Sequence, residues 1–135
     1  MQTFLPHKSF EKSAQVLDYK RLGKQRCECK QILNILLNRT TSKAWRQHPA
    51  VKMWVGYENA LKEYYNCIVN EWIKRGYKNA MQFEEIEEEI IYPTWFENEE
   101  FFASHRANLL RKNKEYYSQF GWSEEDNLPY IWPIK

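Results

Sequence analysis

The feature that most constrains the fold is a stripe of large apolar side chains between residues 50 and 75. It consists of Trp54, Tyr57, Leu61, Tyr64, Tyr65, Ile68 and Trp72. Steps of three and four residues place side chains on one face of an α-helix, whereas a half-buried strand would alternate strictly. The stripe is followed by "KRGY", which has basic residues for a last helical turn and Gly76 for a C-cap. We therefore predict one long helix from Ala50 to Arg75.

Three further helices are predicted around this one. Residues 8–18 form a short amphipathic helix, residues 19–37 repeat apolar side chains at helical steps, and residues 97–117 form one helix kinked near Asn113. Residues 79–96 are compatible with either a strained acidic helix or an irregular arm. No alternating strand pattern occurs, and 4 glycines and 5 prolines are too few for a turn-rich β fold. The pattern therefore predicts an all-α fold.

The size and composition of the chain predict one intracellular domain. With 135 residues, of which 43% are hydrophobic, the chain can bury one core, and we predict a single compact domain over residues 1–135 with an extended aromatic tail, "DNLPYIWPIK". No apolar run approaches the ~20 residues of a membrane span. Three cysteines without regular spacing predict reduced thiols in an intracellular compartment, the cytoplasm, the nucleus or a virion.

Charge is divided unevenly along the chain. Residues 1–52 hold 11 Lys and Arg against 3 Asp and Glu, a net charge of +8, whereas residues 53–135 hold 9 against 15, a net charge of −6. Residues 84–100 contain 8 glutamates and no Lys or Arg. A one-sided basic half is typical of proteins that bind nucleic acids, although patchy charge on a soluble protein is the plain alternative.

The stretch "YKRLGKQRCECKQIL", residues 19–33, concentrates this positive charge. On a helix, Arg21, Lys24, Gln25 and Glu28 share one face, while apolar side chains face the core. Lysine and arginine can neutralise phosphates, and glutamine can read a base edge or fill the gap left by a displaced base. The alternative interpretation is an ordinary solvated helix face.

Two more basic segments extend the predicted contact surface. The loop after residue 37 carries Trp45, which could stack on a base or wedge into a duplex, although most tryptophans are core residues. The pair His105 and Arg106 could reach a phosphate or lie on a helix surface. The residues predicted to contact DNA are Lys20, Arg21, Lys24, Gln25, Arg26, Arg39, Lys43, Trp45, Arg46, His48, His105 and Arg106.

No metal or other cofactor is predicted. Cys27 and Cys29 are two residues apart on a helix, so their side chains point about 200° apart and cannot share a metal. The chain has no CxxC or HxxxH pair, no glycine-rich phosphate loop and no GxSxG elbow.

Three motifs occur in an order that resembles a known family. The segment "HPAVKMWVGYENALKEYYNCIVNEWIKRGY" resembles the central helix of the pyrimidine-dimer DNA glycosylases of the endonuclease V type. "VLDYKRLGKQR" lies where that family has its catalytic basic helix, and "SHRANLLRKNKEYYSQFGW" is similar to its C-terminal helix and aromatic tail. The chain looks closer still to uncharacterised bacterial and viral relatives that share LDxxRLGKQR, HPAxxMW and SHRxxLLRK. The resemblance implies the family's compact all-α fold.

The resemblance also implies an activity on double-stranded DNA. Such an enzyme removes a damaged pyrimidine base and then cleaves the strand at the resulting abasic site. Its nucleophile is the amine of the mature N-terminal residue, which forms a Schiff base with the sugar. A glutamate on the basic helix assists, arginines hold the phosphates, and the DNA is kinked with one base pushed out.

The sequence departs from this pattern in two places. Gln2 is too large to favour removal of Met1, which would leave the amine one residue earlier. Lining up "YKRLGKQR" with the family helix puts Arg21 or its neighbour where the glutamate is expected. Asp18 and Glu28 are then the nearest acids, and Asp18 is the better substitute.

These observations leave three functions open. The favoured hypothesis is a protein that binds double-stranded DNA on this scaffold without the family's glutamate. The second is an active glycosylase or abasic-site lyase, with the Met1 amine or Lys20 as nucleophile and Asp18 or Glu28 assisting. The third is a non-enzymatic interaction module that self-associates or binds a protein through residues 84–100 and the aromatic tail.

Overall fold

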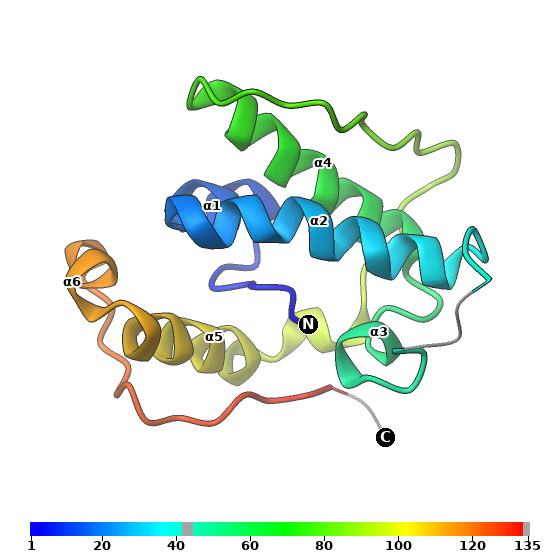
Figure 1. Ribbon diagram of the computed structural model, residues 1–135. Helices are drawn as coiled ribbons and strands as arrows, with labels where there is room; N and C mark the ends of the chain where they lie inside the picture. The colour runs from blue at the N-terminus through cyan, green and yellow to red at the C-terminus, as the bar shows by residue number, and fades with distance from the viewer. Residues whose placement is uncertain (42–44, 134–135) are drawn as a thin grey trace.

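A computed structural model describes residues 1–41 and 45–133. Helices are the only regular secondary structure in these residues, so the predicted all-α class is confirmed (Figure 1). The α-helices are α1 (Phe10–Val16), α2 (Tyr19–Leu36), α3 (Pro49–Lys52), α4 (Glu58–Lys74), α5 (Glu99–Lys112) and α6 (Lys114–Tyr117). Two short 3-10 helices, η1 (Thr94–Glu97) and η2 (Ser118–Phe120), precede α5 and follow α6.

The predicted helix over residues 50–75 is divided into two helices. α3 is a single turn that starts at Pro49, and Gly56 then adopts a φ of 86° before α4 begins. That positive φ cannot be part of a right-handed helix, so the prediction of one continuous helix is wrong at its N-terminal end. The apolar stripe is nevertheless buried except at Tyr57, which is half-buried. The helix ends as predicted, with Gly76 at a φ of 87°.

The other helical predictions agree more closely with the structure. The helix predicted over residues 19–37 is α2, which packs against α4. The kink predicted near Asn113 separates α5 from α6, because Asn113 has a φ of −154° and its side chain caps the first turn of α6. The break lets Tyr117 point into the core, where it is fully buried.

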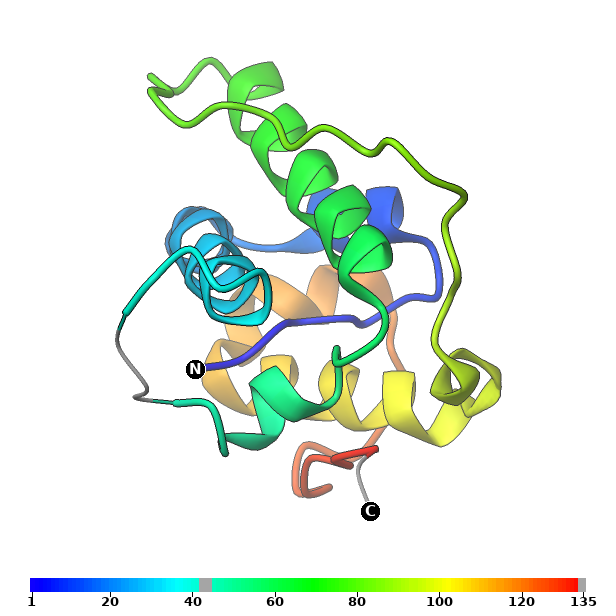
Figure 2. The same cartoon turned by 90° about the vertical axis from the view of Figure 1, so that its right-hand side faces the viewer.

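The segment that sequence left ambiguous, residues 79–96, is irregular as far as η1. It runs back along α4 before it turns toward η1 (Figures 1 and 2). We call residues 79–85 the strap, because they cross α2 and α4 and are tied to both. Glu84 is the buried anchor of the strap, and its carboxylate pairs with Lys30 and Arg39.

The N-terminal segment, residues 1–6, is extended and runs through the middle of the molecule (Figure 2). Its residues hydrogen-bond to side chains of α2, α4 and α5, so it lies between these helices. The C-terminal tail passes along α5, and Tyr130, Ile131 and Trp132 pack against the core. Within the described residues, no helix is both long and apolar enough to cross a bilayer.

Candidate active site and nucleic-acid interface

The start of the chain lies against a glutamate of α2. The backbone N–H of Gln2 donates a hydrogen bond of 3.0 Å to Oε2 of Glu28. Met1 is half-buried and packs against the core, and the N-terminus lies between α2 and α5 (Figure 1). The third turn of α2 therefore supplies a carboxylate within one residue of the N-terminal amine.

Gln25 holds this arrangement from inside the protein. Its Nε2 donates to the carbonyl of Gln2 at 2.7 Å, and its Oε1 accepts from the N–H of Phe4 at 3.1 Å. The side chain has no exposed surface. The predicted contact of Gln25 with DNA is therefore corrected, because helical spacing placed it beside Lys24 but the N-terminal segment covers it.

Asp18, the acid that sequence reasoning preferred, serves a different purpose. Its carboxylate accepts hydrogen bonds from Nη1 of Arg21, 3.2 Å from each oxygen, and from the hydroxyl of Tyr117. It precedes the first turn of α2, and ten residues of helical rise, ~15 Å, separate it from Glu28. Of the two acids, Glu28 is the one at the N-terminus, so the preference for Asp18 is corrected.

His48 closes one side of the site. Its Nδ1 accepts from the N–H of Ala50 at 3.0 Å, which caps α3. Burial lowers the pKa of His48, and the positive charge of the N-terminus lowers it further, against the opposing effect of Glu28. The centroid of the imidazole ring lies 5.6 Å from the ring centroid of Trp45 and 6.0 Å from that of Trp132. The N-terminal amine, Glu28 and a neutral histidine thus share one neighbourhood, with two indole rings next to the histidine.

Trp45 presents its ring to solvent, 56% exposed. Its backbone φ is 70°, which bulky side chains rarely adopt and which often marks functional positions. The alternative that Trp45 is a core residue is therefore wrong, and it remains a candidate for stacking on a base.

Cations from the start of α2 and the end of α5 lie near one another. Lys20 and Lys24 are exposed, and within the described residues neither forms an ion pair. Burial lowers the pKa of Lys112, and the charges of Arg21, Arg111 and Lys24 lower it further. We call Lys20, Arg21, Lys24, Arg111 and Lys112 the cationic face.

Sequence reasoning missed the contribution of α5 and of the tail. Arg111 and Lys112 are the basic last turn of α5, a pattern that also satisfies the helix dipole and so gave no separate signal. Tyr130 lies beside Gln2, and burial raises its pKa to about 12. Only the folding of the tail along α5 brings Tyr130 to the N-terminal segment.

Several predicted DNA contacts are instead engaged within the protein on the strap side. Arg26 lies 4.1 Å above the Trp72 ring and donates from Nη1 to Oδ1 of Asn79 at 2.8 Å. Arg39 donates from both terminal nitrogens to Glu84, at 2.8 and 2.9 Å, and this pairing raises the pKa of Arg39. Both arginines fasten the strap, so their assignment to the DNA surface is corrected.

The pair on α5 is also structural. His105 is buried, its Nδ1 accepts from the N–H of Leu5 at 2.9 Å, and burial lowers its pKa to about 3. Arg106 donates to the carbonyl of Pro6 at 2.8 Å, to Glu124 at 2.6 Å and to Glu99 at 2.7 Å. The prediction that this pair reaches a phosphate is corrected.

The remaining predicted residues lie in the loop between α2 and α3. Arg46 is half-buried and donates from Nη1 to the carbonyl of Ile35 at 3.2 Å, which ties the loop to the end of α2. Lys43 lies outside the described residues. The loop is therefore held to α2 by one of its own cations.

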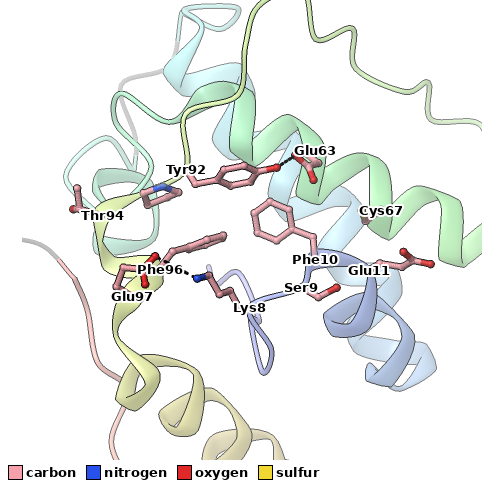
Figure 3. A pocket seen from close by; sticks show the side chains of 11 residues that line it. Lys8, Ser9, Phe10, Glu11, Glu63, Cys67, Tyr92, Thr94, Phe96 and Glu97 are labelled. Atoms are coloured by element: carbon pink, nitrogen blue, oxygen red, sulfur yellow. Dashed lines mark hydrogen bonds and ion pairs between the residues drawn. The ribbon is translucent and has the colours of Figure 1, made fainter.

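A pocket of about 610 Å³ lies away from these residues, between α1, α4 and η1 (Figure 3). Phe10, Tyr92 and Phe96 form its aromatic walls, and Glu63 accepts from the Tyr92 hydroxyl at 2.7 Å. Glu11 and Glu97 add further carboxylates, which would repel a phosphate. The pocket shares no residue with the N-terminal site and does not suit DNA.

The cysteines form no disulfide and belong to no metal cluster in the part of the chain that the structure describes. Cys29 is fully buried, and burial raises the pKa of its thiol. Burial also raises the pKa of Cys67, to about 11. Neither thiol is activated as a nucleophile, because the thiolate is the reactive form.

Comparison with known proteins matches the larger, N-terminal part of the chain to a family model. The family model described as pyrimidine dimer DNA glycosylase matches residues 1–85, which include the N-terminal segment, α2, α3, α4 and the strap. No curated protein and no solved structure matches the chain significantly. The matched region is more than half of the chain and contains both Gln2 and Glu28. The chain therefore belongs to the pyrimidine dimer DNA glycosylase family.

Proposed function

We propose that the protein is a DNA glycosylase and abasic-site lyase that acts on a damaged or modified pyrimidine in double-stranded DNA. The observation that carries this proposal is the 3.0 Å contact between the backbone nitrogen of Gln2 and Oε2 of Glu28. An α-amine on Met1 is one residue, ~3.8 Å between Cα atoms, from that contact. The site thus pairs a nucleophile with an acid–base group.

The chemistry follows from these two groups. The unprotonated amine of Met1 attacks C1′ of the sugar, the bond from C1′ to the base breaks, and the base leaves with that electron pair. Glu28 accepts the proton that the amine releases. Ring opening breaks the C1′–O4′ bond, O4′ takes a proton and an imine forms at C1′. A base then removes a proton from C2′ as the C3′–O bond breaks and the 3′ phosphate leaves, and water finally hydrolyses the imine to restore the amine.

The cationic face would hold the DNA backbone over this site. Its five side chains come from the first turns of α2 and from the last turn of α5, and the charges of Arg21 and Lys24 act on Lys112. Contacts of this kind are made with phosphates and give strong salt dependence. Trp45 and Trp132, next to His48, offer flat apolar surfaces for an unstacked base.

Glu28 is the reason to prefer an enzyme over a scaffold that only binds DNA. The sequence suggested that the assisting glutamate was absent, yet a glutamate of the basic helix contacts the N-terminal segment. Lys20, the alternative nucleophile, is exposed, and no hydrogen bond or ion pair links it to Glu28. We therefore assign the nucleophile to the Met1 amine.

Borohydride trapping on a duplex with one abasic site tests the proposal. The wild-type protein is expected to give a covalent band, and Glu28→Gln to lose at least ~100-fold in trapping rate while still binding DNA. Glu88→Gln, an exposed glutamate at a distance in the chain, is the matched control and is expected to trap normally.

Selective acetylation of the N-terminus separates the two candidate nucleophiles. Loss of the band assigns the imine to Met1, whereas an unchanged band assigns it to Lys20. A gel shift without any trapped band would reject the enzyme and leave a DNA-binding scaffold. Absence of both signals would reject DNA as the partner.

A further inference from the structure

Residues 2–5 are buried without the backbone partners that a buried extended segment normally has. Thr3 and Leu5 have no exposed surface, and Phe4 is 7% exposed. The described residues contain no strand beside this segment. Unpaired backbone groups in the interior are costly, so the hydrogen bonds of this segment must come from side chains.

Four buried side chains from elsewhere in the chain hydrogen-bond to residues 2–5, three of them to the backbone and one to the side chain of Thr3. Besides its bonds to Gln2 and Phe4, Gln25 accepts through Oε1 from the hydroxyl of Tyr64 at 2.8 Å. That hydroxyl also lies 2.5 Å from the carbonyl of Phe4. The partners are completed by Trp54, whose Nε1 donates to Oγ1 of Thr3 at 3.2 Å, and by His105 on the N–H of Leu5. We call Gln25, Trp54, Tyr64 and His105 the clamp.

The side-chain amide of Gln25 makes the two hydrogen bonds that the N–H and C=O of one residue in a neighbouring strand would make. In an extended chain the carbonyl of one residue and the N–H of the second residue after it point to the same side. Gln25 bonds to such a pair, with its Nε2 on the carbonyl of Gln2 and its Oε1 on the N–H of Phe4. The backbone groups dictate which end of the amide is oxygen. A shift of the segment by one residue would turn this pair away from Gln25.

The clamp and the proposed acid are part of one hydrogen-bonded unit. Gln25 and Glu28 are three residues apart on α2, and Nε2 of Gln25 lies 3.5 Å from Oε2 of Glu28. The same carboxylate oxygen accepts from the N–H of Gln2. The position of the N-terminus relative to Glu28 is thus set by the same side chain that sets the register of residues 2–5.

We propose that Gln25 and Tyr64 are positioning residues, which hold residues 2–5 in register so that the N-terminal amine lies at Glu28. This inference rests on the proposed function for its catalytic meaning. Gln25 would thus contribute to the enzyme mechanism by positioning the nucleophile, although it does not itself contact DNA. It also explains why a chain end, ordinarily free to fray, can carry a nucleophile within the ~0.5 Å tolerance that catalysis requires.

The adjacent residues Tyr64 and Tyr65 provide a matched test. Both are fully buried on α4, but the hydroxyl of Tyr64 belongs to the clamp, whereas that of Tyr65 donates to the carbonyl of Gln82 in the strap at 2.7 Å. Tyr64→Phe and Tyr65→Phe each remove one buried hydroxyl and are expected to cost similar stability. We expect Tyr64→Phe to slow trapping at saturating protein about 10-fold, and Gln25→Leu about 100-fold. Tyr65→Phe is expected to stay within about twofold of wild type.

The dissociation constant for the abasic duplex should be unchanged in all three variants, since the clamp is buried. Equal trapping by the two tyrosine variants, whether both slow or both normal, would overturn the assignment. Should Gln25→Leu not fold, the tyrosine pair still decides the question.

Amide hydrogen exchange keeps the clamp testable if the wild-type protein traps no DNA. In that case the proposed enzyme function has failed, but the N–H groups of Phe4 and Leu5 should still exchange faster in Tyr64→Phe than in Tyr65→Phe. Equal exchange rates in the two variants would show that Tyr64 does not hold the segment, and the clamp would be rejected on its own evidence.

Discussion

The two sides of α2 carry similar side chains in different states. Toward α5, Lys20 and Lys24 form no ion pair in the described residues. Toward the strap, Lys30 and Arg39 are paired with the buried carboxylate of Glu84. The acidic half of the chain thus neutralises one side of the basic half and leaves the other side open.

This difference shows why a net charge per segment overstates a binding surface. The net +8 of residues 1–52 includes arginines that stabilise the fold, such as Arg26 on Trp72 and Arg39 on Glu84. The charge of Arg39 is offset by the Glu84 carboxylate, whereas Arg26 keeps its charge but is held against the Trp72 ring and Asn79. Within the described residues, Arg21 is the one member of the cationic face with a carboxylate partner, Asp18, so the other four cations are left to define the DNA surface.

The largest expected effect comes from reversing charge on the open side. The double variant Lys24→Glu, Lys112→Glu should weaken binding to a DNA duplex by at least ~100-fold at 0.1 M salt. The slope of log K against log salt concentration should also become less steep by about 1.8, because each of the two lost phosphate contacts contributes ~0.9. Fluorescence anisotropy over a salt series measures both quantities. The control is Lys74→Glu, which changes an exposed lysine in the last turn of α4. An equal loss of DNA affinity in this variant would show that the open side of α2 is not the DNA-binding surface.

An intermediate effect is expected from acid, which should lower the stability of the clamp and of the strap in different pH ranges. Burial lowers the pKa of His105, in the clamp, from its ordinary 6.5 to about 3, so the unfolded chain binds more protons below pH 6.5 and stability falls as the pH drops from there. The pKa of Glu84, in the strap, is lowered to about 2 from 4.5, chiefly by its hydrogen bond from Arg39. Its contribution is therefore complete above pH 4.5 and is lost as the pH falls through 2.

Urea unfolding from pH 7 to pH 3 separates these contributions. His105→Gln should remove most of the slope between pH 6.5 and 4.5, a slope of up to ~1.4 kcal/mol per pH unit for one proton. Glu84→Gln should lower stability at pH 7 by about 2 kcal/mol, because Lys30 and Arg39 lose their partner, and should flatten the curve below pH 4.5. An unchanged slope in both variants would mean that other groups control acid unfolding.

The smallest effect is expected at exposed aromatic rings. Trp45→Ala should weaken binding to an abasic duplex about 10-fold, the loss of one stacking contact, and change the free energy of unfolding by no more than ~0.5 kcal/mol. Phe83→Ala removes a comparably exposed ring from the strap and should leave DNA affinity unchanged. Equal affinities of the two variants would exclude Trp45 from the interface.

Much of the fold could be predicted because its signals are local. The bounds of α2, the break at Asn113 and the C-cap at Gly76 follow from periodicity, propensity and capping, which act over a few residues. The sharp turn at Gly56 was missed because glycine adopts positive and negative φ about equally well, so its presence in a helical pattern does not predict which one it takes. The candidate site was predicted only in part, since the sequence offered both Asp18 and Glu28 as acids near the basic helix and did not show which one the N-terminal segment contacts.

The sequence by itself determined the all-α class, the basic helix and the resemblance that the family match confirms. The tertiary structure decided which side chains are available for chemistry. Gln25, His105 and Arg106 turn inward to bond the N-terminal segment, while Arg111 and Lys112 come to the cationic face from the far end of the chain. The reason is that periodicity fixes the face of a helix on which a residue lies, whereas its burial and partners depend on segments that pack there from elsewhere in the sequence.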